Sequence, residues 1–251
     1  MSDTSQYFKS SYGDKLAYKV SNVNSEVTLF FFGGYASAMT GTKATSLYEW
    51  SQKQKINLVR FDYSGHGESG GNFKEGTVTK WSREAEEIFH KFKTKKNILI
   101  GSSMGGWISL LVIKKNLNDI NGFIGIASAP DFTISEWLKL STNEQKEFKK
   151  RGSILFPDDD YGEYEVSYKF VNDGFNNVLL DTEININCPI RLLHGRLDKV
   201  VPPSTSEKII EKVLSSDKDL IIIEDGDHSL SREQDLSILF QQIEYLSLIH
   251  I

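Results

Sequence analysis

The chain is poor in cysteine and in proline. Its 251 residues include one cysteine, Cys188, and five prolines. A single thiol excludes a disulfide within the chain, and its position beside Pro189 indicates a small, buried hydrophobic residue of a reduced, intracellular protein. Neither repeats nor a linker-like stretch interrupts the sequence, so we expect residues 1–251 to form one domain.

Long apolar runs and basic patches are also missing from the sequence. No apolar run approaches the ~20 residues needed to span a membrane, and the stretch from Met1 to Tyr7 lacks the apolar core of a signal peptide. The net charge of −5 comes from mixed charges, without the basic, aromatic-rich patches of nucleic-acid-binding proteins. No spacing of the His-Glu-x-x-His kind points to a metal. We therefore expect a soluble, cytoplasmic protein that uses no metal or other cofactor and binds no nucleic acid.

The most informative motif is Gly-Ser-Ser-Met-Gly, which runs from Gly101 to Gly105 around Ser103. The apolar run Asn97–Ile100 before it predicts a buried strand, and the apolar run Gly106–Ile113 after it predicts a buried helix. Gly-x-Ser-x-Gly between a strand and a helix is typical of the nucleophile elbow, a strained turn that exposes the serine hydroxyl. Side chains in place of the two glycines would clash with the neighbouring strand and helix. The pattern predicts a serine hydrolase whose nucleophile is Ser103.

A serine nucleophile needs a histidine as general base. In hydrolases with this elbow the catalytic residues follow the order serine, acid, histidine, and only His194, His228 and His250 follow Ser103. His228 lies just after the strand-like run Leu220–Glu224, in a loop that can reach the elbow. His250 is one residue from the end of the chain, where fraying is expected, and His194 ends an apolar run as a structural residue would. We predict His228 as the base.

The acid should also follow the end of a strand. Asp198 comes four residues after a buried strand, and Asp131 follows another strand end that can supply the acid in this fold. Asp225 and Asp227 are too close to His228 in the sequence to orient its ring easily. We favour Asp198 and keep Asp131 as the alternative.

The developing negative charge needs two backbone N–H donors. One donor is expected at Met104, because the residue after the nucleophile begins a helix whose first amides are unpaired. The other should come from the loop after the strand Val27–Phe32, where Gly33 and Gly34 let the backbone approach closely. We predict the amide of Tyr35 as this second donor; the alternative is that the two glycines form only a tight turn.

Strands and helices alternate along most of the chain. A hairpin is expected over Gln6–Val20, with its turn at Gly13 and Asp14. The alternation predicts an α/β fold with a mostly parallel sheet that helices cover on both faces. The expected strands are Val27–Phe32, Asn57–Asp62, Asn97–Ile100, Gly122–Ser128, Ile190–Leu193 and Leu220–Glu224, and the expected helices are Thr42–Gln54, Thr77–Lys93, Gly106–Ile113, Ser204–Leu214 and Ser231–Leu248.

The alternation breaks between Asp131 and Asn187. Glu136–Lys150 is charged with a helical pattern, and a polar loop is expected from Phe156. An insertion at this point would lie over the C-terminal ends of the strands, where ligands bind in open α/β sheets. We predict a lid over residues 131–187 with an apolar wall for substrate; the alternative is a surface subdomain whose aromatic residues form only its own core. These aromatic residues are Tyr161, Tyr164, Tyr168, Phe170 and Phe175.

The run Gly65–Gly70 fits the spacing Gly-x-Gly-x-x-Gly of dinucleotide-binding loops. No apolar helix start follows it, and no acidic strand end lies ~20 residues further on. We interpret it as a structural loop in which Asp62 and Ser69 hydrogen-bond the turns. His66 is then structural as well, unless the loop brings it to the mouth of the pocket.

Several segments of the chain match the pattern of a known family. They are Gly33–Ala44, Arg60–Gly65, Gly101–Trp107 and Cys188–Gly195. They resemble the α/β-hydrolase superfamily and, within it, the mitochondrial palmitoyl-protein thioesterases and acyl-glucuronide esterases of the abhydrolase-domain group, over nearly the whole chain. The resemblance implies the α/β-hydrolase fold and a triad of Ser103, Asp198 and His228. We expect no transit peptide before Tyr7. Gly33 stands where many members of the wider family have histidine.

These residues predict a carboxylesterase or acyl-protein thioesterase that acts on small-molecule or acylated-protein substrates through an acyl-enzyme at Ser103. Two alternatives remain open. The fold also occurs in proteins that bind ligands without turning them over, and the same triad serves acyltransferases and peptidases.

Overall fold

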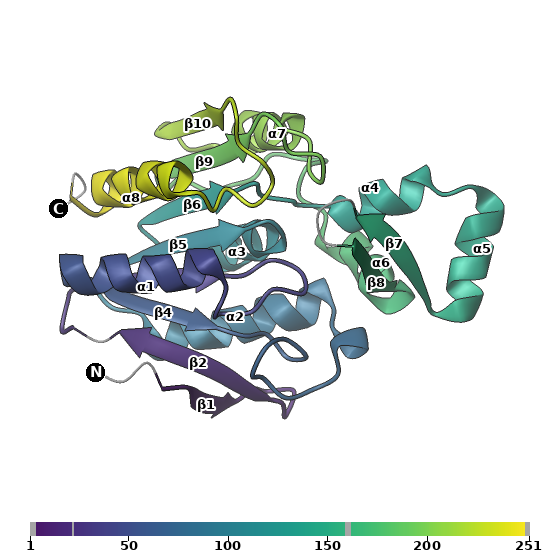
Figure 1. Ribbon diagram of the computed structural model, residues 1–251, viewed down its shortest axis with the longest axis horizontal. Coiled ribbons are helices and arrows are strands. Elements are labelled where there is room, and N and C mark those ends of the chain that lie inside the picture. The colour runs from purple at the N-terminus through teal and green to yellow at the C-terminus, as the bar shows by residue number, and fades with distance from the viewer. Residues whose placement is uncertain (1–3, 22, 159–161, 249–251) are drawn as a thin grey trace.

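The computed structural model describes residues 4–21, 23–158 and 162–248. Across these ranges the chain forms an eight-stranded sheet in the order β1-β2-β4-β3-β5-β6-β9-β10 (Figure 1). β2 pairs antiparallel with β1 and with β4, and the pairs from β4 to β10 are parallel. The strands are β1 Gln6–Lys9, β2 Lys15–Ser21, β3 Val27–Phe32, β4 Asn57–Phe61, β5 Lys96–Ser102, β6 Gly122–Ile126, β9 Ile190–Gly195 and β10 Lys218–Ile223.

Different helices cover the two faces of the sheet, and successive side chains of the central strands alternate between them. On one face Phe30 and Phe32 of β3 pack with α2, α3 and α7, and on the other face Leu29 and Phe31 pack with α1 and α8. Strands buried on both faces need apolar side chains at every position, which explains their unbroken apolar runs. The helices are α1 Thr42–Gln54, α2 Val78–Phe92, α3 Met104–Lys115, α7 Ser204–Lys212 and α8 Glu233–Leu248.

The predicted α/β fold with a mostly parallel, doubly covered sheet is confirmed. The predicted N-terminal hairpin is confirmed as well: Gln6 pairs with Tyr18, and Gly13 in the turn has a φ of +90°. A positive φ of this size is readily adopted by glycine. The helix expected over Thr42–Gln54 has these bounds in the structure.

The insertion between β6 and β9, residues 131–187, stands to the right of the sheet in Figure 1. The prediction of one helix over Glu136–Lys150 is wrong, because the helix breaks at Leu140. Ser141 then caps a second helix, and its hydroxyl and the Glu144 side chain bond each other's backbone N–H groups. This reciprocal cap stabilises a new helix start. The helices of the insertion are α4 Phe132–Lys139, α5 Thr142–Arg151 and α6 Tyr168–Gly174.

The polar loop expected from Phe156 is also wrong in part. The backbone forms an antiparallel hairpin instead, with β7 Ser153–Asp158 paired to β8 Gly162–Ser167. Tyr161, one of the predicted aromatic residues, lies outside the described residues. The described insertion therefore consists of two short helices, a hairpin and a third helix. A three-residue 3₁₀ turn, Phe175–Asn177, follows this helix before the chain returns to β9.

The buried carboxyl group of Glu84 contacts the turn that follows β4. Glu84 of α2 is 0% exposed, and its Oε2 accepts the N–H of Ser64 at 2.9 Å. Burial raises the pKa of Glu84 to about 7, although the hydrogen bond from Ser64 opposes the shift. Between its ordinary pKa of 4.5 and about 7 the folded protein therefore holds a proton that the unfolded chain has released.

We expect the free energy of unfolding to fall as the pH rises from 4.5 to about 7, by at most on the order of 3 kcal/mol from this group. Glu84→Gln has no proton to lose and should flatten this part of the pH profile, measured by urea unfolding at pH 5 and pH 8. The exposed Glu211→Gln serves as the control. An unchanged profile in Glu84→Gln would contradict the assignment.

Candidate active site

Ser103 occupies a sharp turn between β5 and α3. Its backbone has φ 53° and ψ −118°, a conformation that costs free energy in a residue other than glycine. The flanking glycines allow the turn: a Cβ on Gly101 would lie 2.4 Å from the carbonyl oxygen of Gly105, and one on Gly105 would lie 2.0 Å from that of Phe32. The strand, turn and helix predicted around Ser103 are therefore present, and the two glycines are required by backbone contact.

Ser103, His228 and Asp198 form a chain of hydrogen bonds. Nε2 of His228 lies 3.2 Å from Oγ of Ser103, and Nδ1 of His228 lies 2.7 Å from Oδ2 of Asp198. The three residues follow β5, β10 and β9, whose C-terminal ends meet at one edge of the parallel sheet. The side chain of Asp198 is 0% exposed and that of His228 is 12% exposed. The structure thus brings together the three residues that the sequence singled out.

His228 is not the only group that binds the carboxylate of Asp198. Its Oδ1 accepts the N–H groups of Val200 and Val201 at 2.9 and 2.8 Å, and Nε2 of His194 lies 3.1 Å from its Oδ2. Burial alone would raise the pKa of Asp198. The hydrogen bonds from His194 and His228 outweigh that effect and hold the pKa of Asp198 well below its ordinary range. The group is therefore a carboxylate that can orient an imidazole and balance its charge.

His194 contacts the same carboxylate oxygen, Oδ2 of Asp198, as His228 does. Its ring is 0% exposed, with Nδ1 2.7 Å from the hydroxyl of Ser206 and Nε2 2.9 Å from the carbonyl oxygen of Val201. The sequence analysis took His194 as structural and missed its contact with Asp198. The spacing of four residues between the two side chains was the available signal.

Asp131, the alternative acid, holds the insertion instead. Its carboxylate accepts the backbone N–H of Leu179 at 3.0 Å and that of Leu180 at 2.8 Å. These two amides lie where the insertion returns toward the sheet. The structure therefore places Asp131 in the attachment of the insertion, and Asp198 beside His228.

The two other acidic candidates, Asp225 and Asp227, bind groups outside the triad. Asp225 pairs with the guanidinium of Arg232 at 2.8 Å, and Asp227 accepts the N–H of Leu230 at 2.8 Å. Both carboxylates stabilise the loop that carries the candidate base. His250 lies outside the described residues.

The two segments predicted to supply oxyanion donors flank Ser103. Met104 is the first residue of α3 and follows the serine directly. On the other side, a Cβ added to Gly34 would lie 3.3 Å from the Cβ of Ser103, and Tyr35 is the next residue. The loop over residues 33–40, called the β3 loop below, therefore passes so close to the serine that a side chain at position 34 would crowd it.

A pocket of about 550 Å³ opens above Ser103 and His228. The β3 loop and the start of α1 form one wall, largely from backbone and small side chains. The insertion forms another wall, and the loops after β9 and β10 complete the pocket. Besides His228, the larger side chains that line it are Phe31, Tyr35, Lys43, Phe132, Glu136, Tyr164, Val200 and Val201.

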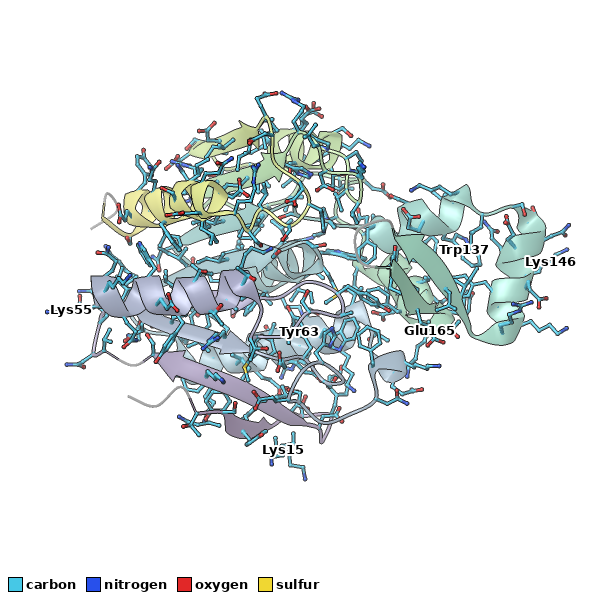
Figure 2. The ribbon with its side chains drawn as sticks, in the orientation of Figure 1. Lys15, Lys55, Tyr63, Trp137, Lys146 and Glu165 are labelled. Carbon is cyan, nitrogen blue, oxygen red and sulfur yellow. The ribbon has the colours of Figure 1, made fainter. Side chains whose placement is uncertain are left out.

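The aromatic residues of the insertion divide between two places. Tyr164 lines the pocket, and Phe170 stacks on the ring of Tyr35 with ring centroids 5.1 Å apart. Tyr168 packs instead within the insertion, 5.6 Å from Trp137, which Figure 2 labels. The insertion thus has a small aromatic core of its own and also presents an aromatic surface to the pocket.

Lys43 joins the start of α1 to the loop that carries His228. Its Nζ donates to the carbonyl oxygen of Ser229 and to the hydroxyl of Ser231, the latter at 3.3 Å. Burial lowers the pKa of Lys43 to about 8, although Asp227 and Asp235 oppose the shift. The sequence analysis did not single out Lys43, because its partners lie more than 180 residues away in the chain.

Within residues 4–21, 23–158 and 162–248, no group of three or more histidine, cysteine or acidic side chains is placed to hold a metal ion. No helix in these ranges is long and apolar enough to cross a membrane. In the Gly65–Gly70 loop, Ser69 Oγ donates to the carbonyl oxygen of Asp62 at 2.6 Å, which confirms that these residues bond the turn.

A family model described as "Serine aminopeptidase, S33" matches residues 24–160 and 158–235 of the chain. Human "Palmitoyl-protein thioesterase ABHD10, mitochondrial" is 36% identical over 220 residues, which cover 87% of this chain and 72% of the human protein. The mouse protein of the same name is 34% identical over 220 residues. These relatives are named mitochondrial, so the cytoplasmic location stays a prediction.

Solved structures match the fold over most of the chain. Alpha/beta hydrolase domain-containing protein 10 from mouse has a TM-score of 0.91 at 32% identity and covers 97% of this chain and 98% of its own. A putative hydrolase from Agrobacterium vitis has a TM-score of 0.90 at 32% identity with the same coverage. The ferulic acid complex of Est1E from Butyrivibrio proteoclasticus shares the fold, with a TM-score of 0.79 at 19% identity.

We expect Asp198→Asn to lower kcat for ester hydrolysis by ~10⁴, because an amide neither balances a charged imidazole nor keeps its tautomer. Asp131→Asn should leave kcat nearly unchanged and lower the melting temperature, since it weakens the bonds to Leu179 and Leu180. Steady-state kinetics on a p-nitrophenyl ester and thermal unfolding measure the two effects. The reverse pattern would make Asp131 the acid.

Proposed function

This chain belongs to the serine aminopeptidase S33 family of α/β-hydrolases, and from that premise we propose that it cleaves acyl thioesters and esters through an acyl-enzyme at Ser103. The observation that carries the proposal is the hydrogen-bonded series Ser103, His228 and Asp198 at the base of a pocket. The names of the thioesterase relatives support the acyl substrate.

The first half of the proposed reaction forms the acyl-enzyme. Oγ of Ser103 attacks the acyl carbon while Nε2 of His228 takes the hydroxyl proton. Nδ1–H of His228 donates to Asp198, whose negative charge stabilises the imidazolium. The tetrahedral intermediate then expels the thiolate or alkoxide, which takes the proton from Nε2, and the acyl group stays on Ser103 as an ester.

The second half hydrolyses this ester. A water molecule gives a proton to Nε2 of His228 and attacks the acyl carbon. The new intermediate collapses to a carboxylic acid, and His228 returns the proton to Oγ of Ser103. Each turnover consumes one substrate and one water molecule, and it leaves Ser103, His228 and Asp198 in their starting protonation states.

Both intermediates carry a negative oxygen, and we assign its donors to the amides of Met104 and Tyr35. Met104 begins α3, where the helix leaves its first N–H groups unpaired and favours negative charge. Gly34 brings the β3 loop against Ser103, so the adjoining Tyr35 amide is near the reacting carbon. A donor of this kind contributes about 10²–10³-fold to kcat in serine hydrolases.

The insertion is proposed as a lid that supplies the apolar wall for the acyl chain. Phe132 and Tyr164 line the pocket from this side, and each CH₂ buried against such surface contributes about 0.8 kcal/mol. A thiolate is a good leaving group that needs little protonation, which favours thioesters over amides. The peptidase activity in the family description is therefore the second candidate, and a peptide substrate tests it directly.

We expect a fluorophosphonate probe to label the wild-type protein and Ser102→Ala, but not Ser103→Ala. The probe reacts only with an activated hydroxyl, and loss of a triad serine typically lowers kcat by about 10⁶. Ser102 lines the same pocket and is the matched control. Labelling that persists in Ser103→Ala, or a wild-type protein that resists the probe and hydrolyses nothing, would overturn the proposal.

We also expect octanoyl thioesters to be cleaved with a higher kcat/KM than acetyl thioesters, by at least about 10-fold, because the longer chain buries more CH₂ groups. Tyr164→Ser should reduce this preference and leave acetyl hydrolysis intact. Phe175→Ser is the control, since Phe175 belongs to the insertion but is 45% exposed outside the pocket lining. Equal kcat/KM values for the octanoyl and acetyl thioesters would contradict the proposal that the insertion binds the acyl chain.

A further inference from the structure

The β3 loop is held by side chains from the end of β4 and from the segment that follows it. Nε2 of His66 accepts the backbone N–H of Ala36 at 3.2 Å. Oδ1 of Asp62 accepts the N–H of Met39 at 2.6 Å, and a guanidinium nitrogen of Arg60 donates to the carbonyl oxygen of Met39 at 2.7 Å. Three buried side chains from one short segment therefore bind the β3 loop at two points, Ala36 in its middle and Met39 near its end.

The surroundings of His66 define which of its ring nitrogens accepts. The ring is 3% exposed and packs edge-on against Trp81 at 4.8 Å and Phe73 at 4.9 Å. Nδ1 lies 3.3 Å from the carbonyl oxygen of Ser64, which can only accept, so Nδ1 carries the proton. Nε2 is then unprotonated and free to accept the N–H of Ala36. Burial also lowers the pKa of His66 to about 4, which keeps the ring neutral.

The bond from Ala36 bears on the neighbouring Tyr35. Ala36 has a φ of 56°, a left-handed conformation that a residue with a Cβ rarely adopts unless its surroundings impose it. The N–H that His66 accepts belongs to the planar peptide unit between Tyr35 and Ala36, so fixing this N–H fixes the unit's orientation. On its other side Tyr35 donates its hydroxyl to the carbonyl oxygen of Glu165 at 2.7 Å. Glu165 is labelled within the insertion in Figure 2.

We propose that His66 is a positioning residue for the oxyanion hole. It fixes the Tyr35–Ala36 peptide unit, which is joined through the Cα of Tyr35 to the unit that carries the Tyr35 N–H, and so restricts the direction in which that N–H points. This inference rests on the proposed function. It does not require His66 to touch the substrate. Loss of the acceptor should then weaken binding of the negatively charged intermediate while leaving binding of the uncharged substrate intact.

The test compares His66→Leu, which has no acceptor, with His66→Gln, whose Oε1 can reach the place of Nε2. We expect kcat on an acyl thioester to fall about 10–100-fold in His66→Leu with little change in KM. Affinity for an acyl trifluoromethyl ketone, which forms an oxyanion on Ser103, should fall by the same factor. His66→Gln should recover most of both losses. The control is His90→Leu on the exposed side of α2.

Equal kcat in His66→Leu and wild type would overturn the inference, as would equal losses of kcat in the Leu and Gln variants. A second measurement uses the wild-type protein and does not depend on the folding of a variant. The ¹⁵N chemical shifts of the His66 ring should show the proton on Nδ1. A proton on Nε2 would also overturn the inference. Labelling of Ser103→Ala with the fluorophosphonate probe separates failure of the proposed function from failure of the role of His66. If Ser103 is not the nucleophile, the proposed function fails; if it is and His66→Leu is fully active, only the role of His66 fails.

Discussion

Backbone contact between the end of β3, the turn at Ser103 and the start of α3 is the constraint on which the rest of the site depends. Gly105 lies so close to the carbonyl oxygen of Phe32 that no side chain fits between them. This contact holds Ser103 in a strained backbone conformation and brings Gly34 against it. The free energy stored in the turn is balanced by the sheet and helix around it, which are buried on both faces. Because the turn fixes the position of Ser103, loops that follow other strands can place His228 and Asp198 beside it.

The loops around the serine are tied to one another by buried polar contacts. Asp198 is bound by two backbone amides and two imidazoles, so groups of the protein stabilise its charge. Lys43 bonds α1 to the loop that carries His228, and His66 bonds the β3 loop to the turn after β4. Because an unpaired polar group is costly in a buried site, these contacts restrict each loop to few arrangements. The site is thus organised before any substrate arrives.

Much of the fold and the placement of the serine could be predicted from the sequence, since both depend on local patterns. The surroundings of Ser103 follow from two glycines between an apolar strand and an apolar helix. The choice between Asp131 and Asp198 could not be made from spacing alone, because it depends on the order β6-β9-β10, which places the loop after β9 beside His228. The helix break before Ser141 was readable from the Ser-x-x-Glu pattern. The contacts of His66 had no local signal, because its partner lies 30 residues away.

The hydroxyl of Tyr35 has a consequence for how such enzymes diversify. Its bond to the backbone of Glu165 joins the β3 loop to the hairpin of the insertion. The contact uses a carbonyl oxygen, so the residue at position 165 can vary while the bond persists. The side chain at position 165 can therefore change without loss of this bond, yet the insertion cannot be exchanged as an independent module. A chimera that takes its insertion from a relative must therefore keep a backbone carbonyl oxygen within reach of the Tyr35 hydroxyl, whatever side chain stands at that position.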